Sequence, residues 1–508
     1  TGYTGELGYE IYADGNAIKS IWKALLKSEK GIMPAGLGCR DTLRMEMKYV
    51  LYGNDINEKT NPIEAGLGWI TKTNKVSFIG KEKLIDLQLS HSKKLICFLL
   101  FIGLFSCELI KQNELEVIFS EDIQYKPYQP KNTDLSISRS DYYDKLYGFW
   151  LGQCIANWTG LITEMDKIGN IGNIKTGNFY TRENWGGFDQ PNIWTKESFV
   201  IDTTKIIDFV FKNKNEIWGS DDDTDIEYMY QYLTLNNSNI LTGKEIREGW
   251  LNHIKPEEEN YLWVSNQKAF DLMNEAILPP KTSDPSLNEH YEMIDAQLTT
   301  EIFGLYSPTR EDFALKMSYL PIRTTARENA AWISEFYVIM HSLASKVDQN
   351  LSLKNQILWL AEESSKILPN GSYSSKMYDF VKNKYESKIP WEQTRDSIYY
   401  RYQVNQKDGY NITSKELNCN GCFAAGINFA SSLVSLFYGE GDFKETIKIG
   451  TLCGWDSDNP TSTWGGLIGF MIGKENIEKT FNRNFSNKYN IHRTRRNFPN
   501  NGIDTFEN

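Results

Sequence analysis

The chain has 508 residues, of which 40% are hydrophobic and 24% are charged, an ordinary composition for a soluble globular protein. Its net charge of −11, without any run of five Lys or Arg residues, argues against nucleic acid as a main partner, because phosphate binding needs clustered cations. No apolar run reaches 18 residues, so no transmembrane helix is expected. The length predicts about three domains. Because the chain begins with Thr1, we expect it to be a fragment.

Residues 1–90 combine short apolar patches with glycine turns, and a helix is predicted over residues 17–28. Five motifs follow one another here: TGYTGELGYEI (1–11), GLGCRDTLRME (36–46), LYGNDI (51–56), EAGLGW (64–69) and FIGK (78–81). Together they resemble the folate-binding domain of the glycine cleavage system T-protein, an aminomethyltransferase. The resemblance implies a truncated α+β domain over residues 1–90.

Two residues of this domain carry the resemblance to a folate site. Glu10 matches the family's pterin-contacting glutamate, since a carboxylate can accept hydrogen bonds from adjacent pterin N–H groups. Arg40 matches an arginine at the substrate site. The alternatives are an exposed carboxylate and an ion pair of Arg40 with Asp41 or Glu46. The family's catalytic aspartate lies N-terminal to these motifs, so we expect tetrahydrofolate to bind only if the domain were completed, and we expect no aminomethyl transfer.

Residues 91–140 form a separate segment with a signal-like pattern. Lys93 and Lys94 precede an apolar run over residues 95–105, and a polar, proline-containing stretch follows Cys107. A cationic start and a short apolar run ending in a small residue are typical of a secretory signal. The ending LFSC resembles the lipobox of bacterial lipoproteins, which implies a lipid anchor at Cys107 and a cell-envelope location if this is a true start, and a cytoplasmic location otherwise. A buried strand or short helix is the alternative.

Residues 141–508 are predicted to be mostly helical. Helical patterns occupy residues 142–157, 224–236, 290–305, 328–346, 353–367, 422–438 and 460–473. Cys419 and Cys422 have C-x-x-C spacing, but no second pair of ligands accompanies them. A disulfide or two buried thiols is therefore favoured over a zinc site.

Two acidic clusters lie far apart in this segment, SDDDTD at residues 220–225 and GWDSDN at residues 454–459. Each precedes a helical pattern, and Asn459 is predicted to cap the second helix with Pro460 as its first residue. Dense carboxylates with no nearby His or Cys pair indicate Mg²⁺, Mn²⁺ or Ca²⁺ rather than zinc. Simple helix capping is the alternative for either cluster alone.

Further motifs join these clusters: DKLYGFWLG at 144–152 followed by Glu164, AQLTTEIFG at 296–304, YGEGDF at 438–443 and RTRRNF at 493–498. The set resembles the ADP-ribosylglycohydrolase family over residues 141–508. The resemblance implies a mainly α, all-helical domain that holds two metal ions, Mg²⁺ or Mn²⁺, between the clusters. It also implies that a glycine-rich first helix ends at Glu164.

The resemblance assigns roles by matching position. The implied metal ligands are Asp221, Asp222, Asp223, Asp456, Asp458 and Asn459. The family usually has Thr at the first and last of these positions, so Asp221 adds a negative charge. Asp223 or Asp458 would orient or deprotonate the attacking water, and Glu164 would lie near the substrate. A surface carboxylate at a helix end is the alternative for Glu164.

The implied activity is metal-dependent hydrolysis of the N- or O-glycosidic bond of an ADP-ribosylated protein or small molecule. A loop over residues 184–194 is rich in Gly and Trp, and its Trp185 and Asp189 are candidates for contacting this substrate, with ordinary loop packing as the alternative. The competing hypotheses for the chain are an inactive aminomethyltransferase fragment, a non-catalytic ADP-ribose-binding surface lipoprotein, and two neighbouring genes joined artificially.

Overall fold

The computed structural model divides the chain into two compact units, Thr1–Lys126 and Pro127–Asn508. In the second unit it describes residues 135–508 except 192, 194–204, 238–239, 258 and 418. In the first unit it describes residues 11, 14–26, 44, 49–51, 56, 60–62, 64–65, 67, 71, 73, 75 and 77–89. The two units are described separately below.

The first unit contains helices α1 (Gly15–Leu26) and α3 (Lys81–Leu89). The helix predicted over residues 17–28 is confirmed as α1, and it begins two residues earlier because the carboxylate of Asp14 accepts a hydrogen bond from the Ala17 backbone N–H over 2.9 Å. Glu10, Arg40 and the signal-like run up to Cys107 lie outside the described residues, so the folate site and the lipid anchor stay predictions.

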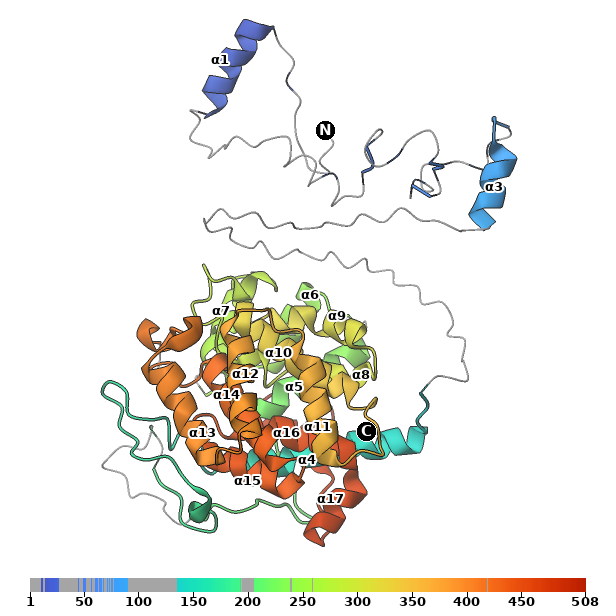
Figure 1. The fold of residues 1–508 in the computed structure, drawn as a ribbon. Coiled ribbons are helices and arrows are strands. Elements are labelled where there is room, and N and C mark those ends of the chain that lie inside the picture. The colour runs from blue at the N-terminus through green and yellow to red at the C-terminus, as the bar shows by residue number, and fades with distance from the viewer. Residues whose placement is uncertain are drawn as a thin grey trace. The chain divides into compact units, whose positions relative to one another are not determined.

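The second unit is mainly α-helical, as predicted (Figure 1). Its helices are α4 (Arg139–Gly160), α5 (Asp222–Asn236), α6 (Gly243–His253), α7 (Val264–Asn274), α8 (Ile302–Tyr306), α9 (Glu311–Ile322), α10 (Glu328–Leu343), α11 (Leu353–Ser365), α12 (Tyr373–Glu386), α13 (Trp391–Ile398), α14 (Ala425–Gly439), α15 (Phe443–Cys453), α16 (Asp458–Ile472) and α17 (Lys474–Phe481). Nearly every residue of α14 is buried, which agrees with a helix that is apolar on all sides. This helix therefore forms the centre of the core.

Helices α4 and α16 pack antiparallel along rows of glycine. A Cβ atom on Gly148 would lie 2.3 Å from the carbonyl oxygen of Gly469, and one on Gly160 would lie 2.5 Å from the Cα atom of Asp458. Only glycine permits such an approach, because any larger side chain would collide with the opposite backbone. The end of α4 is thereby placed directly against the beginning of α16, where the second acidic cluster lies.

A small sheet holds the beginning of α5. Strand β1 (Trp218–Gly219) pairs in parallel with β2 (Lys488–Asn490), and β2 pairs antiparallel with β3 (Ile503–Thr505). Trp218 lies opposite Tyr489 in this register. Because β1 leads directly into the first acidic cluster, the sheet brings the C-terminal part of the chain against that cluster.

The predicted helices correspond to α4, α5, α10, α11, α14 and α16, and the prediction of one helix over residues 290–305 is wrong. That stretch forms a 3-10 turn (Ile294–Ala296) and the short α8. Its side chains bond the backbone instead of continuing a helix: the Thr299 hydroxyl donates to the Asp295 carbonyl oxygen, and the Asp295 carboxylate accepts from the Asn266 backbone N–H.

Two details at other helix ends also differ from the prediction. Ser457 caps α16, so Asn459 lies inside the helix and Pro460 is its third residue. Helix α4 ends at Gly160, and Glu164 lies in the turn that follows. Cys419 and Cys422 form a disulfide, one of the two predicted states. Within the described residues, no helix is both long and apolar enough to cross a membrane.

Candidate metal centre

Glu164 and the second acidic cluster are brought together by a short backbone junction. The Met165 N–H donates to the carbonyl oxygen of Trp455 over 2.9 Å, and the Trp455 N–H donates to the carbonyl oxygen of Lys167 over 2.8 Å. These two bonds join the turn after α4 to the segment before α16. Glu164 therefore lies beside Asp456, although 292 positions separate them in the sequence.

Six carboxylates meet at this junction: Glu164, Asp221, Asp222, Asp223, Asp456 and Asp458, called the acidic cluster from here on. Carboxylate oxygens of Glu164, Asp456 and Asp458 lie within 4.8 Å of one another, and so do those of Asp221, Asp222 and Asp458. Asp458 belongs to both groups and is 2% exposed. Glu164 and Asp222 are half-buried, so they form the side of the cluster that is open to solvent.

Asp223 lies deeper and is held by two amide donors. Asn157 of α4 donates to its Oδ2 atom and Asn459 of α16 donates to its Oδ1 atom, each over 3.3 Å. The Oδ1 atom of Asn459 in turn accepts a hydrogen bond from Gln297 over 3.2 Å. In this arrangement Asn459 presents its amide nitrogen to the cluster, whereas the sequence predicts that it offers an oxygen to a metal.

The acidic segment at residues 220–225 is held in place by the start of α5. Asp221 is the N-cap residue, and its backbone N–H donates to the Thr224 hydroxyl over 3.1 Å. The Ser220 hydroxyl is 2.8 Å from the hydroxyl of Thr494, beside strand β2. At the other side, the Asp456 N–H donates to the side-chain oxygen of Asn428 in α14. Helix starts and asparagine side chains thus determine where each carboxylate lies.

Burial and mutual repulsion disfavour the ionised state of five carboxylates of the cluster. Burial first, and neighbouring carboxylates second, raise the pKa values of Glu164, Asp222, Asp223 and Asp458 well above their ordinary range. Burial raises the pKa of Asp456 to about 7, with further contributions from neighbouring carboxylates. A bound cation would reverse this preference, because it stabilises the ionised form of each ligand.

The residues present fit a hard divalent cation. Oδ1 of Asp458 is buried and has no hydrogen-bond partner among the described residues. A buried oxygen of this kind costs free energy unless a proton or a cation satisfies it. Carboxylate oxygens are the ligands that Mg²⁺, Mn²⁺ and Ca²⁺ prefer, and no His or Cys belongs to either candidate group of described residues.

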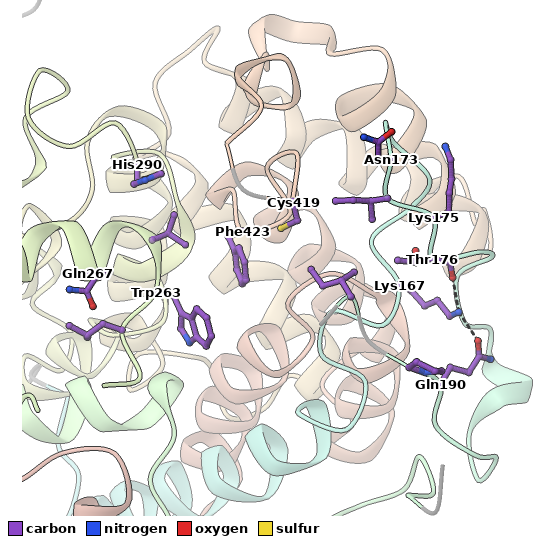
Figure 2. A pocket seen from close by; sticks show the side chains of 15 residues that line it. Lys167, Asn173, Lys175, Thr176, Gln190, Trp263, Gln267, His290, Cys419 and Phe423 are labelled. Atoms are coloured by element: carbon purple, nitrogen blue, oxygen red, sulfur yellow. Dashed lines mark hydrogen bonds between the residues drawn. The ribbon is translucent and has the colours of Figure 1, made fainter. Parts of the chain in front are cut away.

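A cavity of about 1030 Å³ has Lys167, which follows Glu164 by three residues, in its wall. Figure 2 shows Trp263 and Phe423 on one part of its wall and Lys167, Thr176 and Gln190 on another. The rings of Trp263 and Phe423 are nearly parallel, with centroids 6.3 Å apart, and Trp263 is 47% exposed. Nζ of Lys167 donates to Gln190 over 2.6 Å and to the Thr176 carbonyl oxygen over 2.8 Å.

The cavity shares chain segments with the acidic cluster. Lys167, which lines it, also accepts the backbone bond from Trp455 that places Asp456. Next to Phe423, which also lines the cavity, the Cys422 carbonyl oxygen accepts a hydrogen bond from the Asn428 side-chain nitrogen, and the Asn428 side-chain oxygen accepts from the Asp456 N–H. The cavity wall is thus connected to the acidic cluster through the backbone, although none of the six carboxylates lines the cavity.

The two loop residues predicted to contact substrate lie elsewhere on this surface. The Trp185 ring packs edge-on against Phe209, with centroids 5.0 Å apart, and is not among the described residues that line the cavity. The Asp189 carboxylate accepts from the backbone N–H of Gln190, which does line it. These contacts agree with the packing alternative for Trp185 and leave its role, like that of Asp189, a prediction.

Sequence reasoning missed four polar residues that organise the cluster: Asn157, Gln297, Asn428 and Arg493. Three are amides inside motifs or helices and give no signal of their own. Arg493 opens the basic RTRRNF motif, in which nothing distinguishes it from the neighbouring arginines. Its Nη1 atom lies 2.8 Å from Oδ1 of Asp221.

The fold and the site define a mainly helical domain that contains a carboxylate-rich centre and a large cavity. The sequence model of the ADP-ribosylglycohydrolase family matches residues 138–500, which is more than half of the chain. The chain belongs to this family.

Other similarities concern parts of the chain or its fold. The GCVT N-terminal domain model matches residues 1–75. An aminomethyltransferase of Halothermothrix orenii is 54% identical over 101 residues, which are 19% of this chain and 28% of that protein. An aminomethyltransferase of Bacteroides thetaiotaomicron is 61% identical over 74 residues, which are 14% of this chain and 20% of that protein. The chain thus spans 28% of the length of the first of these relatives and 20% of the second.

A solved structure described as an ADP-ribosylglycohydrolase-related protein complex aligns with 66% of this chain and 89% of its own chain. The sequence identity is 14% and the TM-score is 0.37.

Proposed function

We propose that residues 138–508 hydrolyse the glycosidic bond of an ADP-ribosylated protein or small molecule, with Mg²⁺ or Mn²⁺ held by the acidic cluster. Family membership supports the reaction class. The observation that carries the metal dependence is the position of Asp458, which is shared by two groups of carboxylates and has a buried oxygen without a partner among the described residues. Two groups that share one carboxylate suit two neighbouring cations.

The cations would supply Lewis-acid stabilisation and lower the pKa of a water molecule, as in other two-metal hydrolases. Asp221, Asp222, Asp456 and Asp458 would hold them. Asp223 keeps one orientation because Asn157 and Asn459 donate to its two oxygens, so it is suited to orienting the attacking water. Glu164 is half-buried at the open side of the cluster, where it would meet the substrate ribose.

The cavity would hold the remainder of the substrate. The exposed face of Trp263, stacked near Phe423, offers a surface for a planar base. Lys175, an exposed cation on the cavity wall, is suited to a diphosphate. Since the cavity and the cluster share segments, a bound nucleotide diphosphate would place its distal ribose near the carboxylates.

The test is release of free ADP-ribose from ADP-ribosylated arginine, serine and small-molecule substrates by the full chain. We expect release with Mg²⁺ or Mn²⁺, loss of release with excess EDTA, and recovery when metal is returned. Release that persists in EDTA would contradict the metal dependence. Binding of ADP-ribose without release from any substrate would favour a binding module over an enzyme.

A further inference from the structure

Asp221 forms an ion pair with Arg493 at the edge of the acidic cluster. Nη1 of Arg493 donates to Oδ1 of Asp221 over 2.8 Å and to the Ser220 carbonyl oxygen over 2.5 Å. The Asp221 side chain is 7% exposed and the Arg493 side chain 33%. Of the ion pairs between described residues, this is the one that includes a carboxylate of the acidic cluster.

The guanidinium of Arg493 is held in this position from several sides. It lies over the ring of Trp158, 5.0 Å from the centroid, and 5.4 Å from the centroid of Tyr261. A Cβ atom on Gly219 would lie 2.7 Å from Cδ of Arg493, so the glycine in strand β1 leaves room for the arginine side chain. An arginine confined by two rings and one strand loses little further freedom when it binds a carboxylate.

We propose that Arg493 is a positioning residue that serves as the permanent counter-charge of Asp221 and thereby lowers the affinity of the acidic cluster for divalent cations. The inference rests on the proposed function, because it concerns the same cations. Arg493 occupies Oδ1 of Asp221, while Oδ2 lies 3.4 Å from the amide nitrogen of Asn157. A positive charge one hydrogen bond from a ligand repels a cation and neutralises one of the six carboxylates.

The charge of the pair matters for the whole site. The Asp221–Arg493 pair is neutral as a whole. The pair thus adds an oxygen atom that can bind a metal, without adding net charge to a site that already contains five other carboxylates. The same reasoning predicts that removing the arginine alone makes the net charge of the site more negative, whereas removing both partners leaves the net charge unchanged.

The test uses three variants of the full chain: Arg493→Met, Asp221→Thr combined with Arg493→Met, and Arg483→Met as the matched control. Arg483 also stacks on an aromatic ring, 4.5 Å from the Phe211 centroid, and bonds Asn213 rather than the cluster. Affinity for Mn²⁺ is measured by calorimetry at low ionic strength, and the unfolding temperature is measured in EDTA.

We expect Arg493→Met to bind Mn²⁺ about tenfold more tightly and, without metal, to unfold several degrees lower, because one carboxylate has lost its counter-charge. The double variant should return to within about threefold of the wild-type affinity, and Arg483→Met should not change it. If the role of Arg493 were purely structural, the change in Mn²⁺ affinity would have the opposite sign, since removal of the arginine would weaken both stability and Mn²⁺ binding.

Unchanged or weaker Mn²⁺ binding by Arg493→Met overturns the inference. If that variant does not fold, the double variant provides the test. A Mn²⁺ affinity of the double variant that departs from the wild-type affinity by more than about threefold then overturns the inference. A wild-type chain that binds no Mn²⁺ contradicts the proposed function together with this inference. Binding by the wild type without the shift in Arg493→Met contradicts this inference alone.

Discussion

Gly152 of α4 and Gly465 of α16 pack backbone against backbone, so that a Cβ atom on Gly152 would lie 2.2 Å from the Gly465 carbonyl oxygen. This contact lies in the same antiparallel row that places the end of α4 against Asp458. The row therefore links the packing of the two helices to the geometry of the acidic cluster.

Gly152→Ala should separate the two helices, because the methyl group meets backbone rather than a side chain that can move. We expect a loss of about 3 kcal/mol in the free energy of unfolding, measured with urea, and weaker Mn²⁺ binding. Gly409→Ala is the control: nothing lies within 4 Å of that position, and only its φ of +88° opposes alanine. The control should keep wild-type Mn²⁺ affinity, and a Gly152→Ala variant that also keeps it would contradict the link between packing and site.

Asn459→Ala should destabilise the metal-free protein. It removes the donor to Oδ1 of Asp223, a carboxylate that is 2% exposed. Loss of one partner from a buried acceptor costs about 1–3 kcal/mol, and added Mn²⁺ should restore part of this loss. Thermal unfolding with and without metal measures both effects. Asn476→Ala, at an exposed position in α17, should change neither, and an equal effect in the two variants would count against the role of Asn459.

Glu227 and Glu301 form a second, fully buried pair of carboxyl groups away from the cluster. Burial raises the pKa of Glu301 to about 7 from an ordinary value of 4.5, and burial followed by the charge of Glu301 raises that of Glu227. The folded chain therefore retains protons that the unfolded chain has released, so stability is full below about pH 4.5 and falls as the pH rises toward 7 and above.

Glu227→Gln should flatten this decline by roughly 2–3 kcal/mol between pH 5 and pH 8, measured by urea unfolding in EDTA. The new amide can be accommodated, because Oε1 of the neighbouring Gln153 has no partner among the described residues. The cluster is the same in both chains, so its own titration cancels in the comparison. Glu257→Gln, at an exposed position, is the control. Parallel pH profiles for wild type and Glu227→Gln would rule out this pair as a source of the decline.

Trp263→Ala should weaken ADP-ribose binding without destabilising the fold, since the ring is half exposed on the cavity wall. Loss of one stacking surface predicts a decrease in affinity of about 3–10-fold, measured by calorimetry. Tyr400→Ala removes another exposed aromatic ring, 59% exposed, that is not among the residues lining the cavity. Equal affinities in the two variants would show that the base lies elsewhere.

The carboxylates of the site could be predicted from sequence because its two acidic segments, 220–225 and 454–459, are each continuous in sequence and lead into a helix. Asn157, Gln297 and Arg493 could not, because each meets its carboxylate or amide partner only through the packing of α4, the 294–302 turn region or the C-terminal segment. A neutral amide within a helical pattern looks like any other buried residue, because the sequence does not show which group its side chain contacts.

The fold was predictable where a long stretch is densely apolar, as in α10 and α14. The error over residues 290–305 has a physical cause. Threonine and aspartate side chains there bond nearby backbone groups, which competes with helix formation while leaving the apolar pattern unchanged.

The most direct test of the account is ADP-ribose release by Asp458→Asn, compared with Asp379→Asn at an exposed position in α12, each with saturating Mg²⁺ or Mn²⁺. Because Asp458 belongs to both carboxylate groups, we expect its substitution to abolish release and to weaken Mn²⁺ binding, while Asp379→Asn retains both. An Asp458→Asn chain that releases ADP-ribose at the wild-type rate would contradict the assignment of the acidic cluster as the catalytic centre.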